Sequence, residues 1–320
     1  MGGWRNAVYI WTVVVLAVLA GLSIVPTPFY VLAPGGAIDL GKRITVAGHA
    51  APERRLYLTD VVLARASVLL LAAVVLPGTR IVRRDRVLPA GESARGFDRV
   101  MGDAMGESQN VAGIVAERAA GLRVEVPPAR VCVADVPFRT GTRVLRRGDC
   151  FTRVGSIATQ TEGDLKRALA SLGRARVARI RILRDGAERD LDVPTIATTH
   201  GVRLGVLVNE RVPAAHLPVA VRYAFDDVSG SSGGLMFALH IYGALRGVRA
   251  GEPVAGTGTI ALDGTVGPIE GTRQKLIAAE RAGAKLFLVP VANYAEISHE
   301  RGIRIVPVPT FAAALEVLRS

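Results

Sequence analysis

The stretch that decides the fold is Asp227-Val-Ser-Gly-Ser-Ser-Gly-Gly-Leu-Met-Phe237, in which a strand-like run ends in a turn of small residues and a helix begins. Such a turn holds a hydroxyl at a helix amino terminus, where free backbone N–H groups and the helix dipole favour the negative charge of a tetrahedral acyl intermediate. From this stretch alone, the nucleophile could be Ser229, Ser231 or Ser232. The same turn is also common as a plain helix cap.

Outward from this turn, strand-like and helical segments alternate to the end of the chain. A strand is expected at residues 217–225, a hairpin at 256–269 and a strand at 285–291, with helices at 233–245, 273–283 and 309–319. This alternation predicts a layered body of the α/β (α+β) class.

A serine nucleophile needs a base, and none of the five histidines lies in an obvious partner motif. A lysine can serve when burial lowers its pKa, whereas an arginine side chain stays protonated. Lysines number only four in this arginine-rich chain, and Lys275 directly precedes the apolar residues 276–279 of an expected helix. The alternative for Lys275 is an ordinary position on the helix surface.

Two segments carry a resemblance to a known family: GSSGGLMFAL at residues 230–239 and GTGTIALDGTVGPIEGTRQKLIAAERAGAKLFLVP at residues 256–290. They resemble the proteolytic domain of Lon, whose pattern is Gly-Pro-Ser-Ala-Gly and then Thr-Gly-Glu-Ile through Pro-Ile-Gly-Gly to Lys-Leu-Leu-Ala-Ala. The resemblance places the family's serine on Ser232, its lysine on Lys275, and the threonine that supports the lysine on Thr257. It implies a serine endopeptidase with a Ser–Lys dyad.

The chain departs from this family pattern at three positions. Ser231 stands where the family has proline, Gly233 where it has alanine, and Glu270 where it has one glycine of a pair. A carboxylate at Glu270 would raise the pKa of Lys275. Because of these departures, a catalytically inactive membrane adaptor on a protease scaffold is the alternative hypothesis.

In the expected reaction, neutral Lys275 accepts the Ser232 proton and the backbone N–H groups of Ser232 and Gly233 stabilise the oxyanion. Asp227 is expected to support the dyad, and Gly233 and Gly234 to leave room for the substrate backbone. Neither a cofactor nor a metal is implied. The sequence contains no GxxxxGK[ST] loop, so we expect ATP-independent cleavage of unfolded or partly processed proteins.

Residues 122–199 predict a β-rich unit with one helix, inserted into the protease domain. The Gly-Asp strand at 147–156, the helix at 163–172 and a hairpin turning at Asp185-Gly186 resemble a PDZ domain in order and spacing. Such a domain binds an extended or C-terminal peptide as an added strand. Gly121 and Leu122 are the expected start of its carboxylate loop.

The resemblance covers nearly the whole chain and divides it into four parts. Residues 1–33 form an anchor, 34–121 the first part of the protease domain, 122–199 the PDZ-like unit, and 200–320 the catalytic part. Within the second part, GDAMGESQNVAGIVAERAAGL at residues 102–122 resembles the Lon segment that opens a helix before the catalytic strand. The whole arrangement resembles the membrane-bound Lon-like proteases with a PDZ domain found in bacteria.

Residues 7–25 carry no charge and approach the ~20 residues needed to cross a bilayer. They predict a single-pass transmembrane helix, with a cleaved signal peptide as the alternative. Arg5 precedes the run and no Lys or Arg follows until Lys42, which predicts a cytoplasmic amino terminus and a catalytic body outside the cell membrane. The apolar residues 66–78 are too few for a second span and are expected as a buried strand or helix.

The formal net charge of +12 would suit a nucleic-acid binder, but the basic residues are scattered and no aromatic–basic motif accompanies them. We therefore expect no nucleic-acid partner. The expected partners are protein or peptide substrates, the lipid bilayer and, from the resemblance, further copies in a ring such as a hexamer. The two cysteines, Cys132 and Cys150, lack metal-ligand spacing, and the sequence leaves open whether they pair as a disulfide.

Overall fold

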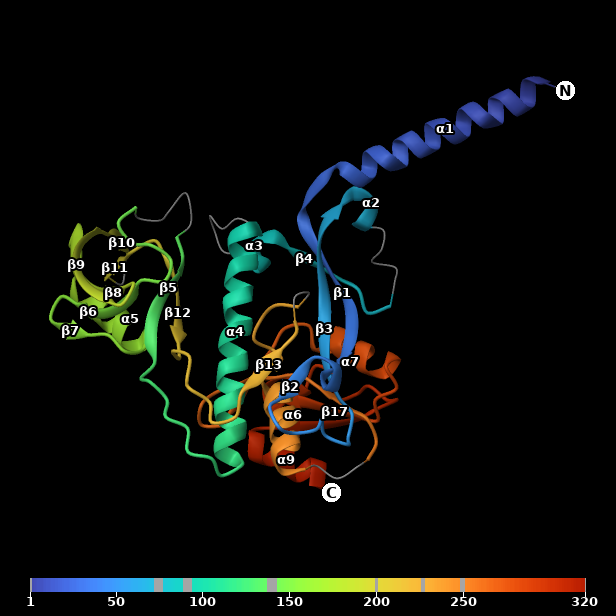
Figure 1. Cartoon of the computed structure of the whole chain (residues 1–320). Coiled ribbons are helices and arrows are strands. Elements are labelled where there is room, and N and C mark those ends of the chain that lie inside the picture. Colours follow the sequence, from blue (N-terminus) through green and yellow to red (C-terminus); the bar gives the residue numbers. More distant parts are fainter. Residues whose placement is uncertain are drawn as a thin grey trace.

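The body of the protein is built on a mixed sheet between two layers of helices (Figure 1). The computed structural model describes residues 2–71, 77–88, 94–136, 143–198, 201–225, 228–247 and 251–319. The strands of this sheet are β1 (Pro26–Asp39), β3 (Leu56–Ser67), β4 (Arg80–Arg83), β14 (Val254–Gly256), β17 (Leu286–Pro290) and β18 (Arg304–Val308). Their order across the sheet is β18-β17-β14-β3-β1-β4.

The centre of this sheet is parallel and buried on both faces. Strand β14 pairs in parallel with β3 and β17, and β17 with β18, whereas β1 pairs antiparallel with β3 and β4. All residues of β17 are buried, as expected of a strand with helices on both sides. Its side chains alternate between two cores, since Leu288 packs with one cluster and Phe287 with the other.

Helices α4 (Ala94–Ala119), α6 (Gly234–Arg246) and α9 (Phe311–Arg319) supply the larger core on one face, and α7 (Thr272–Arg281) covers the other. The expected α/β class is confirmed by this layering. The remaining elements of the body are short: η1 (Leu40–Lys42), β2 (Ile44–Val46), α2 (Val68–Leu71), α3 (Arg84–Val87), β13 (Val221–Tyr223), β15 (Thr259–Ile260), β16 (Val266–Gly267) and α8 (Val291–Tyr294).

A second, β-rich unit lies beside α4 (Figure 1) and has its own hydrophobic core. Its elements are β5 (Arg130–Asp135), β6 (Cys150–Val154), β7 (Ile157–Ala158), α5 (Glu162–Ser171), β8 (Val177–Arg184), β9 (Ala187–Pro194), β10 (Ile196–Thr198), β11 (Gly201–Arg203) and β12 (Leu207–Arg211). The main sheet has the order β12-β5-β6-β8-β9. The β8–β9 hairpin turns at Asp185 and Gly186, both with positive φ, as the Asp-Gly pair predicts.

The unit extends further along the chain than the predicted boundary at residue 199. Strand β12 pairs with β5, and Leu204 belongs to the core of the unit, so the body resumes only after Arg211. This difference arises because short strands are specified by their pairing partners rather than by their own sequence.

After Arg211 the chain returns to the body along α4, in a stretch that we call the return segment (residues 212–219). The Val212 N–H donates to Glu107 Oε1 at 2.5 Å, and the amide of Asn110 binds backbone atoms of Val212, Pro213 and Ala215. Further along, the Val219 N–H donates to the buried Glu117 at 3.3 Å. One face of α4 therefore holds the return segment along its length.

The other end of the unit leaves from the carboxyl terminus of α4. The Gly121 N–H donates to Arg118 O and the Leu122 N–H to Glu117 O, both at 2.9 Å. Gly121 has φ of 85°, so this is a Schellman motif with glycine in the left-handed position. The predicted carboxylate loop at Gly121 and Leu122 is thus not formed, because both N–H groups close the helix instead.

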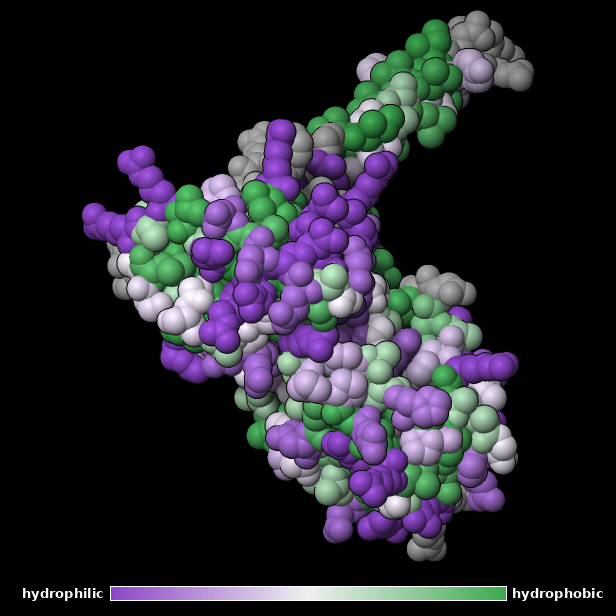
Figure 2. Space-filling view, turned by 60° about the vertical axis from the view of Figure 1, so that its left-hand side comes forward, coloured by the Kyte–Doolittle hydropathy of each residue, from purple (hydrophilic) through white to green (hydrophobic). Residues whose placement is uncertain are grey.

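Helix α1 (Gly2–Ile24) precedes β1 and projects away from the body, with exposed apolar side chains (Figures 1 and 2). No helix in the described ranges combines the length and the apolarity that crossing a membrane requires. The predicted single-pass span at residues 7–25, and the membrane localisation derived from it, are therefore wrong. The second apolar stretch begins as the end of β3 and α2, and its residues 72–76 lie outside the described residues.

A buried ion pair holds the β-rich unit together. Arg184 on β8 donates from Nε and Nη2 to the two carboxylate oxygens of Asp149, each at 2.6 Å, and the Arg146 N–H adds a third bond at 2.7 Å. The side chain of Asp149 is 1% exposed and that of Arg184 is 12% exposed. Such a pair is strongly destabilising when one partner is removed.

We predict that Asp149→Ala lowers the free energy of unfolding of the β-rich unit by roughly 3 kcal/mol or more, because it leaves the Arg184 charge buried without its partner. Urea unfolding of the full chain, followed by hydrogen exchange within β6 and β8, measures the change. The matched control is Asp190→Ala, which breaks an exposed pair with Arg181 on the same sheet. Equal effects of the two substitutions would contradict the prediction.

Candidate active site

Ser232 lies in the turn that leads into α6, and this turn is held in place from two sides. From α4, the Ser108 hydroxyl donates to Ser231 O at 3.0 Å, and Met101 O accepts from the Gly230 N–H at 2.9 Å. From the end of β14, Ser232 O accepts from the Gly258 N–H at 2.8 Å and from the Thr257 hydroxyl at 3.1 Å. We call residues 230–233 the nucleophile turn.

Lys275 reaches this turn from the opposite face of the sheet. It lies in α7, is 2% exposed, and places Nζ 2.5 Å from Ser232 Oγ and 3.1 Å from Thr257 Oγ1. Thr257 directly follows the parallel strand β14, so the three side chains meet at the carboxyl end of a central strand. Gly271 allows α7 to start there, since its φ is 75° and a Cβ would lie 2.9 Å from Val61.

Burial lowers the pKa of Lys275 to about 8, and the charge of Asp60 on β3 acts in the opposite direction. The cause is desolvation, which disfavours the charged ammonium in a protein interior. Half of the amine is thus neutral near pH 8, so it can accept a proton from a neighbouring hydroxyl. Glu270, which was predicted to raise this pKa, is an exposed residue, and the opposing charge comes from Asp60 instead.

Two backbone donors beside the hydroxyl remain free to bind a ligand. Within the described ranges, the N–H groups of Ser232 and Gly233 have no acceptor, whereas the Leu235 N–H donates to Gly258 O at 3.1 Å. Free N–H groups at a helix start suit the developing oxyanion of an acyl transfer. The arrangement therefore combines a hydroxyl, an amine whose pKa is lowered to about 8, and two N–H groups without an acceptor among the described residues. Such a set suits nucleophilic attack on a carbonyl.

Gly233, in the nucleophile turn, and Gly234, the first residue of α6, both pack closely against neighbouring side chains. A Cβ on Gly233 would lie 2.7 Å from the ring of Phe237, and a Cβ on Gly234 would lie 2.8 Å from Ile260. These positions face the core, so the absence of side chains permits close packing of α6.

The remaining predicted site residues lie elsewhere or are not described. Ser229 is exposed, and Ser231 lies beside Ser232 with its carbonyl bound to Ser108. Asp227 is outside the described residues. Sequence reasoning missed Asp60 and Ser108, although Ser108 lies in the stretch at 102–122 whose resemblance to Lon was noted.

The comparisons with known proteins concern this part of the chain. Residues 220–306 match the Lon protease (S16) C-terminal proteolytic domain. Lon protease 2 of Bacillus subtilis is 37% identical over 90 residues, which are 28% of this chain and 16% of that protein. An archaeal Lon protease of Archaeoglobus fulgidus is 31% identical over 96 residues, which are 29% of this chain and 16% of that protein.

A Lon protease of Azospirillum brasilense is 33% identical over 123 residues, which are 37% of this chain and 15% of that protein. The chain thus matches only about a sixth of the length of these curated relatives. Residues 220–306 therefore resemble the proteolytic domain of proteins named Lon protease.

We predict that Asp60→Asn lowers the pKa of Lys275 below its value of about 8, because it removes the charge that favours the ammonium form. Titration of 13C-labelled lysine followed by NMR measures this pKa, and only four lysines need assignment. Asp263→Asn, an exposed carboxylate on the β15–β16 turn, is the control. An unchanged or raised pKa in the Asp60 variant would rule out this electrostatic coupling.

We also predict that Ser108→Ala slows the reaction of Ser232 with a fluorophosphonate by about tenfold or more, because a nucleophile turn that loses one anchor samples misaligned geometries. Mass spectrometry of the labelled peptide gives the rate. Ser298→Ala, which removes an exposed hydroxyl-to-carbonyl bond in the same body, should react like the parent. A folded Ser108 variant that labels at the parental rate would refute the positioning role.

Proposed function

We propose that this protein is an ATP-independent serine endopeptidase in which Lys275 is the base for Ser232. The observation that carries the proposal is the 2.5 Å contact between Lys275 Nζ and Ser232 Oγ in a buried site, with the pKa of the lysine lowered to about 8. The match of residues 220–306 to the proteolytic domain of Lon supports it independently.

In the proposed reaction, neutral Nζ of Lys275 takes the proton from Ser232 Oγ, which attacks the scissile carbonyl carbon. The N–H groups of Ser232 and Gly233 donate to the oxyanion. Nζ then gives its proton to the leaving amine and an acyl-enzyme ester remains. A water molecule hydrolyses the ester with Nζ again as base, while Thr257 Oγ1, at 3.1 Å, keeps the amine in line.

We further propose that the β-rich unit selects substrates as a PDZ-like domain, and that its peptide site lies between the free edge of β12 and α5. Among the described strands, β12 pairs with β5 on one side only, which leaves the other edge open for an added strand. Helix α5 begins beside this strand, since the Glu162 N–H donates to Glu210 Oε1 at 2.7 Å. The turn at Leu204 and Gly205, just before β12, is the proposed carboxylate loop.

The proposed substrates are unfolded or partly processed proteins. This sequence contains no GxxxxGK[ST] phosphate-binding loop, so the proposed cleavage draws on no ATP-driven unfolding. A segment with an extended backbone fits both the edge of β12 and the nucleophile turn. Assembly of several copies into a ring, such as a hexamer, is a further proposal that rests on the resemblance to Lon.

We predict that Ser232→Ala and Lys275→Met each reduce cleavage of an unfolded test protein by at least about a thousandfold, because each removes one half of the dyad. Lys275→Met should keep or raise the thermal midpoint, since it removes a buried amine that burial disfavours. Activity of the parent should rise as pH increases through about 8, where Lys275 becomes neutral.

Ser231→Ala is the matched control and should remain active, because it deletes the neighbouring hydroxyl only. Activity retained by Ser232→Ala would refute the assignment. A parent protein that binds peptides but cleaves nothing under any of these conditions would instead favour the adaptor hypothesis.

A further inference from the structure

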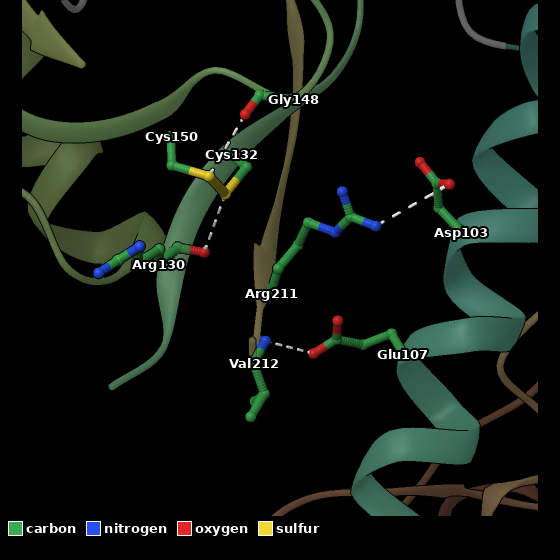
Figure 3. Close-up of a disulfide and its surroundings, with 8 residues drawn as sticks. All are labelled: Asp103, Glu107, Arg130, Cys132, Gly148, Cys150, Arg211 and Val212. Atoms are coloured by element: carbon green, nitrogen blue, oxygen red, sulfur yellow. Dashed lines mark hydrogen bonds and ion pairs between the residues drawn. A yellow bond between two sulfur atoms is a disulfide. The ribbon is translucent and has the colours of Figure 1, made fainter. Parts of the chain in front are cut away.

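A pocket of about 430 Å³ lies between the β-rich unit and α4, and a disulfide forms part of its wall (Figure 3). Cys132 on β5 and Cys150 on β6 are bonded to each other, and both line the pocket together with Asp103 and Glu107 of α4. Cys132 is 1% exposed, whereas Cys150 is partly exposed. A small molecule in the pocket therefore lies against both cysteines, of which Cys150 is the more exposed residue.

This disulfide joins β5 and β6, two neighbouring strands with little backbone pairing between them. Strand β5 pairs along its length with β12, and β6 pairs along its length with β8. Within the described part of the chain, β5 and β6 share the single registered pair Cys132 and Cys150. Two backbone bonds flank that pair, from the Val133 N–H to Asp149 O and from the Gly148 N–H to Val133 O. The S–S bond thus joins a half made of β12 and β5 to a half made of β6, β8 and β9.

Both halves are held by one carboxylate of α4. Arg211, at the end of β12, approaches Asp103 at 3.9 Å, and Arg147, just before β6, pairs with the same side chain at 2.5 Å. Figure 3 shows Arg211 directed at Asp103, with the Val212 N–H bonded to Glu107 one helical turn further on. Separation of the halves would move one arginine or the other away from Asp103.

The same stretch of α4 holds the nucleophile turn. Met101 O accepts from the Gly230 N–H, and the Ser108 hydroxyl donates to Ser231 O. Along the helix, Met101 and Ser108 lie on either side of Asp103 and Glu107. Contacts that fix the β-rich unit therefore lie between contacts that fix the turn, all within about two turns of one helix.

We propose that the Cys132–Cys150 disulfide is a thiol-accessible redox site that controls how the β-rich unit docks on α4. The co-reactant is a small thiol that enters the pocket. Its thiolate attacks the sulfur of Cys150, and the S–S bond breaks with its electron pair on Cys132, which then takes a proton from water. A second thiolate attacks the outer sulfur of the mixed disulfide and releases Cys150 as a thiol. The reagent leaves as its own disulfide, which can reverse the reaction.

The test uses the full chain and dithiothreitol at concentrations that leave the protein folded. Alkylation and mass spectrometry follow the two thiols, and hydrogen exchange follows β5, β12 and residues 211–215. We expect native-state reduction and exchange that is faster by about fivefold or more in these segments, the lower end of typical coupling between sites. A disulfide that reduces only when the chain unfolds, or exchange that is unchanged after reduction, would overturn the inference.

The effect on catalysis rests on the proposed function. Reduction should slow cleavage of an unfolded protein by about fivefold or more but leave cleavage of a short peptide nearly unchanged, because only the former uses the β-rich unit. If neither redox form cleaves any substrate, the proposed peptidase fails. The thiol and exchange measurements still decide the redox site in that case.

Two variants separate the disulfide from its surroundings. The double variant Cys132→Ser with Cys150→Ser should show the same hydrogen-exchange rates as the reduced parent, and these rates should not change when dithiothreitol is added. Asp103→Asn should loosen the same segments while the disulfide is intact, because both arginines lose their partner. If the double variant does not fold, the reductant titration of the parent decides the question. A double variant that folds and exchanges like the oxidised parent would refute the proposal.

Discussion

The contact between the Lys275 amine and the Ser232 hydroxyl exists because the body keeps a lysine out of water. Helix α7 packs on one face of the sheet and α6 on the other, and the two side chains meet where β14 ends. Desolvation of the amine is unfavourable in itself, so the surrounding packing must offset it. The buried, alternating side chains of β17 and the apolar face of α6 supply that packing.

The nucleophile turn is held in place by hydrogen bonds to its backbone carbonyls. The carbonyls of Ser231 and Ser232 are both occupied, by Ser108 on one side and by Thr257 and Gly258 on the other. Within the described residues, the N–H groups of Ser232 and Gly233 have no hydrogen-bond acceptor. Thr257 serves twice, since its hydroxyl lies within hydrogen-bond distance of both Lys275 Nζ and Ser232 O. Its removal would disturb the base and the turn together.

The sequence predicted the local pieces well, because they follow from short-range patterns. The helices at α6, α7 and α9, the buried strand β17 and the turn at Asp185-Gly186 all lie close to their expected positions. The role of Ser108 could not be predicted from the sequence, since its partner Ser231 lies 123 positions away and only the packing of the folded chain brings the two together. Gly121 was misread because a glycine after a helix serves equally as a loop or as a Schellman cap. The prediction of a membrane span was wrong because it relied on the hydropathy of residues 7–25 alone. No helix in the described ranges has the length and apolarity that a span needs.

The two junctions of the β-rich unit with the body both contact the same residue, Glu117. The Leu122 N–H donates to the carbonyl of Glu117 as the chain departs, and the Val219 N–H donates to its carboxylate as the chain comes back. The two junctions are therefore neighbours in space, although almost a hundred positions of sequence separate them. Because its two ends lie this close together, the length of the inserted module is not dictated by the path of the body on either side.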